Sequence, residues 1–399
     1  KLNISVALKR GIATSTETNM IKNKKIMSIM RLSHTFREFS SAYADLGTFL
    51  PLVLGLVVVA DMSPVGLLFG FGIFAIGTGL YYQRPIPVQP MKAVAAMGIA
   101  GIAGPEVLIA TGLLLGVTLL ILSQTQSIGW LKGLIPKTVL FGMRVALAVS
   151  LVAMTSQFAD VSFGPVAVLV GLLILLQFSP IRSISCLIVL VFGWVWLGNP
   201  VNAADLTFEL SFPSLVLPSA DAMLRSLELT FLPQLALTLT NALILTSVIS
   251  QEYFPDRSSQ LNEKRFALTS GLANVVLAPF GAMPMCHGAG GLSAHYGLGA
   301  RSGVSIIIFG LSCLLLALCF GSQASSVLAL IPHEVIVTLV LYAAWVLADP
   351  PKILSVKPSC QCIILIMVPI SLSAGLVAAL LSGVALEWAL SKSWKPHEA

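Results

Sequence analysis

The middle of a long apolar region reads Phe280-Gly281-Ala282-Met283-Pro284-Met285-Cys286-His287-Gly288-Ala289-Gly290-Gly291-Leu292-Ser293-Ala294-His295. Its glycines, its proline and its two histidines are poorly suited to the interior of a continuous transmembrane helix. They are typical of a place where a helix breaks, or begins again, in the middle of the bilayer.

A second stretch of the same kind occurs earlier and reads Arg84-Pro85-Ile86-Pro87-Val88-Gln89-Pro90-Met91-Lys92-Ala93-Val94-Ala95-Ala96. Its residues 89–93 correspond to residues 283–288 of the later stretch. Interrupted apolar segments at corresponding positions in two halves of a chain indicate the binding site of a secondary transporter. The pair is therefore interpreted as the functional centre.

The composition excludes a soluble globular protein. Of 399 residues, 56% are hydrophobic and 10% are charged, with a mean hydropathy of +0.93, whereas about a quarter of the residues in soluble domains are charged. Apolar runs of about 20 residues recur, and they predict an all-α, polytopic membrane protein in a lipid bilayer. The formal charge of +6 needs no nucleic-acid partner, because Lys and Arg gather in the tail and the short loops.

Residues for catalysis or metal binding do not form a recognisable pattern. The six cysteines are scattered, mostly in apolar segments, and are interpreted as packing thiols without a disulfide framework. The sequence contains no nucleophile–base pair and no phosphate-binding loop of the Gly-Lys-Ser type. We therefore expect no enzyme, no catalytic residue, no metal site and no cofactor.

Fourteen transmembrane segments are predicted, in two repeats of seven. Segments 1 to 7 are Glu38–Ala60, Ser63–Tyr81, an extended piece through Pro90 with a half-helix to Gly101, Glu106–Ser123, Pro136–Gln157, Gly164–Phe178 and Ser183–Leu197. Segments 8 to 14 are Leu224–Ser250, Phe266–Pro279, a break over Gly281–Met285 with a half-helix to Tyr296, Gly303–Phe320, Pro332–Ala348, Ser359–Ile370 and Ser373–Leu390. A re-entrant pair is the alternative for segments 13 and 14.

The predicted domains follow from these segments. They are a basic N-terminal tail over 1–36, a first repeat over 37–200, a connecting loop over 201–220, a second repeat over 221–391 and a C-terminal tail over 392–399. The N-terminal tail is a cytoplasmic extension, sequence upstream of a start at Met27 or Met30, or a transit peptide.

Loop charges predict the orientation. With the N-terminus inside, the outer loops carry acids and almost no cations, at Asp61, Glu106, Asp160, Asp205, Glu209 and Asp221. The inner loops carry cations, at Lys132, Lys137, Arg182, Arg257, Lys264, Arg265, Arg301, Lys352, Lys357, Lys392 and Lys395. This distribution obeys the positive-inside rule. It predicts cytoplasmic termini, and we expect the cell membrane, plasma or inner, as the location.

The two halves echo each other at a nearly constant offset. Residues 135–139 correspond to residues 331–335 at about 196 residues, and Pro90 corresponds to Pro284 at about 194. Two further pairs lie about 190 residues apart, Glu38 with Glu228 and Asp45 with Gln234. Because seven is odd, the second copy must enter the membrane from the opposite side. The pattern predicts inverted repeats with a pseudo-two-fold axis in the membrane plane.

An inverted pair of half-helices places two helix N-termini near one another at the bilayer midplane. Each carries unsatisfied N–H groups and roughly half a positive charge, so together they form an anion site. The glycines after His287 let a tetrahedral ligand approach the backbone. Lys92, in the first turn of its half-helix, opposes the dipole unless an anion or carboxylate neutralises it. Snorkelling, or a purely structural pair with Asp45, is the alternative.

Other polar residues near the breaks have either a functional interpretation, as ligands or proton carriers, or a structural one. His287 donates to an oxyanion, shuttles a proton, or caps the helix. The amides of Gln89 and Gln234 suit oxygen ligands or link helices, and Asn241 is interpreted as a link between helices. Three residues near segment ends are expected to face solvent or lipid headgroups, namely His295, Arg144 and Arg301.

Import of a dianion against the membrane potential requires coupling. At about 100 mV the charge alone costs roughly 2 × 2.3 kcal/mol. Uphill uptake therefore needs cotransported cations, at least about two protons for neutrality. Asp45 is the deepest acid and either balances Lys92 or carries a proton. The titratable candidates for proton coupling are Asp45, Glu38, Glu228 and His287.

The sequence resembles the molybdate transporter family of plants, algae and bacteria, a branch related to the sulfate permeases. Residues 87–96 and 280–292 resemble the two signatures of that family, and residues 299–303 fit the end of the second. Glu38 and residues 45–48 match its first segment, and Gln234-Leu235 with Asn241 resemble its eighth. The likeness runs from about residue 37 to residue 391.

This resemblance implies molybdate uptake and two intertwined inverted repeats, as in sulfate and nucleobase carriers. Segments 1–4 and 8–11 would form a mobile core, and segments 5–7 and 12–14 a scaffold that often dimerises, so a homodimer is expected. Ala44 stands where family members usually have glycine. The chain ends soon after segment 14, and no cytoplasmic regulatory domain is expected. The expected substrate-binding residues are Asp45, Thr48, Gln89, Met91, Lys92, Gln234, Cys286, His287 and Gly288.

The sequence therefore predicts a secondary active importer of molybdate that is proton-coupled and moves like an elevator. A carrier of sulfate or another tetrahedral oxyanion is the nearest alternative, because sulfate shares the charge and shape of molybdate. A passive anion channel is the alternative from a different class.

Overall fold

The computed structural model describes residues 35–158, 161–198, 207–208 and 210–392. The predicted tails, over 1–36 and 392–399, and the predicted connecting loop, over 201–220, lie wholly or partly outside these residues.

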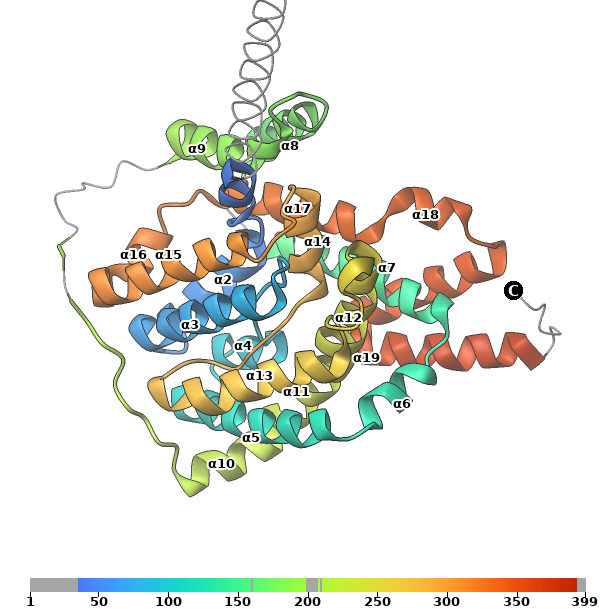
Figure 1. Cartoon of the computed structure of the whole chain (residues 1–399), viewed down its shortest axis with the longest axis horizontal. Helices are drawn as coiled ribbons and strands as arrows, with labels where there is room; N and C mark the ends of the chain where they lie inside the picture. The colour runs from blue at the N-terminus through green and yellow to red at the C-terminus, as the bar shows by residue number, and fades with distance from the viewer. Residues whose placement is uncertain (1–34, 159–160, 199–206, 209, 393–399) are drawn as a thin grey trace, which may run out of the picture.

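Helices make up most of both halves of the chain (Figure 1). Those of the first half are α2 (Leu46–Val58), α3 (Pro64–Tyr82), α4 (Lys92–Ile99), α5 (Pro105–Gln124), α6 (Ser127–Gly133), α7 (Lys137–Met154), α8 (Phe163–Gln177) and α9 (Ser185–Leu197). Those of the second half are α10 (Ala220–Ser226), α11 (Leu232–Leu237), α12 (Thr246–Tyr253), α13 (Glu263–Leu277), α14 (Ala289–Gly297), α15 (Val304–Phe320), α16 (Ala324–Leu328), α17 (His333–Ala348), α18 (Pro350–Ser355) and α19 (Pro358–Lys392).

Local signals explain where these helices begin. The Ser63 hydroxyl accepts a hydrogen bond from the Gly66 amide, and Pro64 occupies the first position of α3. The Asn262 side chain accepts from the Arg265 amide at 3.0 Å and caps α13. Short polar side chains at the N-cap and proline at the first position are the preferred start of a helix. The predicted starts of segments 2, 4, 11 and 12 therefore agree with the structure to within one residue.

The two predicted helix breaks are present, and they lie side by side. Strand β1 (Gln89–Pro90) pairs antiparallel with β2 (Met285–Cys286), so that Gln89 lies opposite Cys286. The Met91 amide donates to the Pro284 carbonyl at 2.9 Å. Helix α4 starts two residues after Pro90, and α14 starts shortly after β2. The structure thus confirms that both half-helices begin at one place in the protein.

Segments 1 and 8 have a different form in the structure. Segment 1 is two helical pieces, Thr35–Ser41 and α2, which meet at 43°. Segment 8 alternates α-helix with two π-helical stretches, η4 (Leu227–Phe231) and η5 (Thr238–Leu245). Segments 13 and 14 correspond to two helices within α19, which meet at a kink at Gly375, where φ is 86°. In the described residues, six helices are long and apolar enough to cross a membrane, or seven if the bent pair counts as one span. The total of fourteen therefore stays a prediction.

The helices pack in two groups, and Figure 1 shows α3, α15, α13 and α5 on the left, α7 and α19 on the right, and α8 and α9 at the top. In one group, α3 packs along α15 and α5 packs along α13, which pairs predicted segment 2 with segment 11 and segment 4 with segment 9. In the other, α7 packs against α19 and α17, and α17 also contacts α8 and α9. Strand β1 contacts α2 and strand β2 contacts α13, and α14, which follows β2, contacts α17 and α7 of the second group.

Glycines allow α3 and α15 to approach closely. A Cβ at Gly79 would lie 2.6 Å from the carbonyl oxygen of Gly303 and 2.7 Å from Ile307 Cγ1. A Cβ at Gly303 would overlap the Gly79 carbonyl in turn. Small residues at such contacts let helix backbones pack directly against each other in membranes.

Gly79→Ala is therefore expected to destabilise the protein, because backbone atoms must separate to accommodate the methyl group. Overpacking of this kind costs about 1–3 kcal/mol. Gly77 is a matched control on the same helix, since a Cβ there meets nothing within 4 Å. Thermal unfolding in detergent should show a lower Tm for Gly79→Ala and an equal or higher Tm for Gly77→Ala. Equal melting of both variants would contradict the close packing.

Candidate anion-binding site

Side chains from both halves of the chain line a small cavity beside the strand pair. Its volume is about 10 Å³, close to the minimum that one water molecule needs. A tetrahedral oxyanion therefore requires the walls of the cavity to move apart. The lining residues are Gln89, Pro90, Lys92, Gln234, Leu237, Asn241, Ala242, Cys286 and His287.

The side chain of Gln234 covers the N-terminus of α4. Its Oε1 accepts hydrogen bonds from the amides of Ala93, at 2.9 Å, and Val94, at 3.3 Å. Its Nε2 donates to Thr238 Oγ1 at 2.9 Å. These two amides are among the donors that a helix leaves unpaired at its start. Gln234 thus holds the positions where an oxyanion would bind, and a rotation of its side chain would free them.

Asp45, Thr48 and Gln89 form a hydrogen-bonded cluster beside the first turn of α14. Thr48 Oγ1 donates to Asp45 Oδ1, and Gln89 Nε2 donates to Asp45 Oδ2 at 2.5 Å. The cluster lies against the backbone of α14, because a Cβ at Gly288 would overlap Gln89 Oε1 and a Cβ at Gly291 would overlap Asp45 Oδ2. A side chain at either position would therefore displace the cluster. A carboxylate beside a helix N-terminus is favourable.

Lys92 is the first residue of α4 and the one cation among the described residues that line the cavity. Asp45 is the acid that acts on it electrostatically. None of the salt bridges in the described part of the chain includes it. Its ammonium group therefore adds positive charge to a helix end that is already positive, an arrangement that an anion stabilises.

His287 joins the two breaks to each other. Its Nδ1 lies 3.0 Å from the carbonyl oxygen of Pro87, which can only accept, so Nδ1 carries the hydrogen. Its Nε2 lies 2.8 Å from Thr269 Oγ1, and the ring is enclosed by the aromatic rings of Phe74 and Phe266. Both ring nitrogens thus have protein partners. This geometry favours a role in holding the two extended pieces together.

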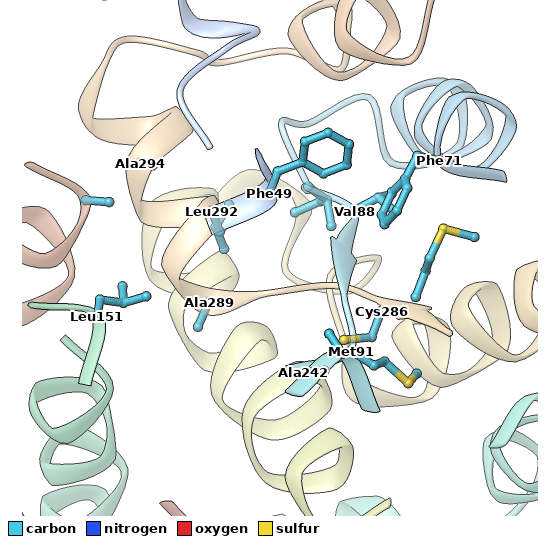
Figure 2. Close-up of a cluster of buried hydrophobic side chains, with 14 of the residues drawn as sticks. Phe49, Phe71, Val88, Met91, Leu151, Ala242, Cys286, Ala289, Leu292 and Ala294 are labelled. Carbon is cyan, nitrogen blue, oxygen red and sulfur yellow. The ribbon is translucent and has the colours of Figure 1, made fainter. Parts of the chain in front are cut away.

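The remaining predicted residues of the breaks are Met91, Cys286 and Gly288. Figure 2 shows the side chains of Met91 and Cys286 next to each other where the two strands cross, with Ala242 of η5 beside them. Met91 is fully buried, and Cys286 lines the cavity. Cys286 therefore forms a soft part of the wall that also contains Lys92, whereas Met91 and Gly288 are not among the residues that line the cavity.

Two predicted proton-coupling residues lie outside the cavity. Glu38 is buried, and its Oε1 accepts from the amides of Arg301, at 3.0 Å, and Ser302, at 3.1 Å. Glu228 is exposed on η4. The structure brings Asp45 and His287 into the broken region but does not bring these two glutamates there.

The expectation that Arg144 and His295 face solvent or headgroups is wrong. His295 is 2% exposed and Arg144 is 4% exposed. Arg144 Nη1 donates to Glu252 Oε2 at 2.9 Å, and its Nη2 lies 3.8 Å from Asp349 Oδ2. Glu252 of α12 and Asp349, which lies between α17 and α18, are the acidic partners of the guanidinium group, so a position near a segment end did not predict exposure. Arg301 is exposed, as expected.

The fold has a counterpart among solved structures. It is similar to the transmembrane domain of a cyanobacterium bicarbonate transporter, BicA, with a TM-score of 0.59, 18% identity, and coverage of 86% of this chain and 96% of that chain. This likeness shows the fold, which is that of an integral, multi-pass membrane protein.

The chain belongs to the molybdate transporter family. The family model described as "Molybdate transporter of MFS superfamily" matches residues 37–151 and 228–347, more than half of the chain. Among its relatives is Molybdate transporter 2 of Arabidopsis thaliana, 28% identical over 372 residues, which cover 80% of each chain. Another is Molybdate transporter 1 of the same plant, 28% identical over 397 residues, which cover 87% of this chain and 84% of the relative. The family consists of transporters and not of enzymes.

Proposed function

We propose that the protein is a secondary active transporter that imports molybdate and is driven by protons. One observation carries the proposal: the start of α4, with Lys92, and strand β2, which leads into α14, line a single cavity. Helix N-termini and a cation together stabilise an oxyanion. The relatives that are named as molybdate transporters support molybdate as the particular oxyanion.

A molybdate binding isotherm with a sulfate competition curve tests this function. We expect the purified protein to bind molybdate saturably and a large excess of sulfate to displace little of it. Strong competition by sulfate would overturn the molybdate assignment in favour of sulfate or another tetrahedral oxyanion. In proteoliposomes, currents that do not depend on any ion gradient would identify a passive anion channel instead.

We infer further that the transporter moves like an elevator, with the α3–α15 and α5–α13 group as a core and the α7–α17–α19 group as a scaffold. The reciprocal pairing of segment 2 with 11 and of 4 with 9 supports two inverted repeats. Loop charges support cytoplasmic termini and a location in the cell membrane. Movement of the core would separate the walls of the cavity, which is too small for the substrate as it stands.

Ion pairs of Glu252 with Arg144 and Lys352, here called the charged clasp, join α12 to α7 and α18. Helix α12 contacts α13 of the core group, and α7 belongs to the scaffold group. The clasp lies at the end that the loop charges place in the cytoplasm. Glu252, at the end of α12, accepts from Arg144 of α7 and from Lys352 of α18, both at 2.9 Å. Tyr253 Oη lies 3.1 Å from Arg144 Nη2, and the ring of Tyr253 stacks on that of Tyr296 in α14 at 4.0 Å. Separation of the core from the scaffold at this end must break the ion pairs of Glu252.

Glu252→Gln is therefore expected to favour the conformation in which the cytoplasmic end is open. A partly exposed ion pair contributes up to about 1 kcal/mol, which corresponds to a shift of up to about fivefold. Mass spectrometry can follow the rate at which a thiol reagent applied from the cytoplasmic side labels Cys286. This rate should rise severalfold in Glu252→Gln. It should not change in Asp221→Asn, which removes only an exposed pair with Arg225. Unchanged labelling of Cys286 in Glu252→Gln would argue against the clasp.

A further inference from the structure

We propose that Asn241 is a ligand of the transported oxyanion, with its side-chain amide donating a hydrogen bond to one oxygen of the anion. The inference rests on the proposed function, since it names a further binding residue of the same site. It replaces the interpretation of Asn241 as a link between helices.

The side chain of Asn241 is buried in the cavity wall without a partner. The residue is 7% exposed and lines the cavity with Gln89, Lys92 and Cys286. Its Oδ1 has no hydrogen-bond partner among the described residues. A side chain that links helices would show such a bond. A buried polar group without a partner costs about 1–3 kcal/mol, and native structures keep few of them without a reason.

The other buried amides around the broken segments have partners, which makes Asn241 the exception among them. Gln89 bonds with Asp45 and Thr48, and Gln234 bonds with the start of α4. Asn274 exchanges two hydrogen bonds with the backbone of Met285, at 2.7 and 2.8 Å. These three side chains hold the breaks in place, whereas the side-chain oxygen of Asn241 accepts no hydrogen bond from the described residues.

The backbone around Asn241 has the geometry of a functional site. Asn241 lies in the π-helical stretch η5, and its own carbonyl accepts from Thr246 Oγ1, five residues later, at 2.9 Å. π-Helical turns are rare and occur frequently at functional sites. The next residue, Ala242, lies beside Met91 and Cys286 (Figure 2). This π-helical stretch thus lies against the paired strands.

The chemistry of an amide suits an oxyanion held by Lys92. A tetrahedral oxyanion without protons can only accept hydrogen bonds, and an Asn side chain offers two N–H donors. A half-turn of the amide plane exchanges the positions of Oδ1 and Nδ2, so either end can face the cavity. Lys92 would then supply charge, and Asn241 a neutral, directional contact on the opposite repeat.

The test compares molybdate Kd and ligand-free Tm for three variants of the full chain in detergent. Asn241→Ala should raise Kd about tenfold or more, as expected for a lost hydrogen bond to a charged group. Its ligand-free Tm should equal or exceed that of the wild type, because a buried group without a partner is removed. Asn241→Asp should raise Kd further, since a carboxylate repels the anion.

Thr240→Val is the matched control. Thr240 is the adjacent residue in η5, it is buried to a similar degree, and its hydroxyl bonds only to its own helix, at the Ala236 and Leu237 carbonyls. This variant should keep the wild-type Kd.

Wild-type Kd in Asn241→Ala would overturn the inference and leave the proposed function intact. A lower ligand-free Tm with unchanged Kd would also overturn it, in favour of a link between helices. If the wild type binds sulfate and not molybdate, the assignment of molybdate as the substrate is wrong. Weaker sulfate binding by Asn241→Ala would then still support the inference. A wild type that binds neither anion would overturn both.

Discussion

Lys92→Ala is expected to raise the Kd for molybdate by about 100-fold or more and to remove measurable uptake at concentrations that saturate the wild type. Lys92 is the single cation of the cavity wall among the described residues, and it stands at the first position of α4. A hydrogen bond to a charged group contributes about 1.5–3 kcal/mol, and loss of the ion pair in a site away from water adds to this. An isotherm on the purified variant measures the effect.

Lys137→Ala is a close control for this prediction. Lys137 is also the first residue of its helix, α7, but it is exposed and does not line the cavity. Its removal should leave Kd unchanged, whereas Lys92→Arg, which keeps the charge, should recover part of the affinity. Wild-type binding by Lys92→Ala would mean that the anion does not bind at the start of α4.

Asp45→Asn is expected to abolish accumulation driven by a pH gradient while Kd changes by no more than a few-fold. Inward movement of a dianion against about 100 mV costs roughly 2 × 2.3 kcal/mol, so uphill import fails when the proton carrier is lost. Asp45 is 7% exposed and contacts Thr48 and Gln89 within the broken region. Asparagine has nearly the same shape but cannot take up and release a proton. Uptake into proteoliposomes with an acidic exterior measures the accumulation ratio.

The other predicted carriers provide the comparison. Glu228 is exposed and does not line the cavity, so Glu228→Gln should accumulate molybdate like the wild type. Both ring nitrogens of His287 have hydrogen-bond partners, Pro87 and Thr269. Replacement of His287 is therefore expected to affect Tm more than it affects proton coupling. Full accumulation by Asp45→Asn would exclude Asp45 as the proton carrier.

Helix positions were predictable because their signals are local. Ser63 and Pro64 mark the start of α3, and Pro105 marks the start of α5, so both starts can be recognised from adjacent residues alone. The breaks before Lys92 and before Ala289 follow from prolines and glycines in otherwise apolar segments. Both breaks appear at the predicted residues, and the antiparallel strand pair brings them together.

The π turns of segment 8 and the bend between the two helical pieces of segment 1 could not be predicted in the same way. Apolar content is the same whether the turns of η5 are α or π. A π turn and a bend within a helix depend on what packs against them. Periodicity along a single segment carries no information on those neighbours.

By itself, the amino-acid sequence determined that this chain is a multi-pass helical membrane protein, where its helices break, and which residues surround those breaks. Only the tertiary structure decided which side chains meet: Gln234 with the start of α4, His287 with Pro87, and Arg144 with Glu252. It also left Asn241 without a partner in the cavity wall. The physical reason is that a helix start depends on residues within one turn of it. A hydrogen bond between residues 100 or more positions apart depends on the angles at which whole helices pack.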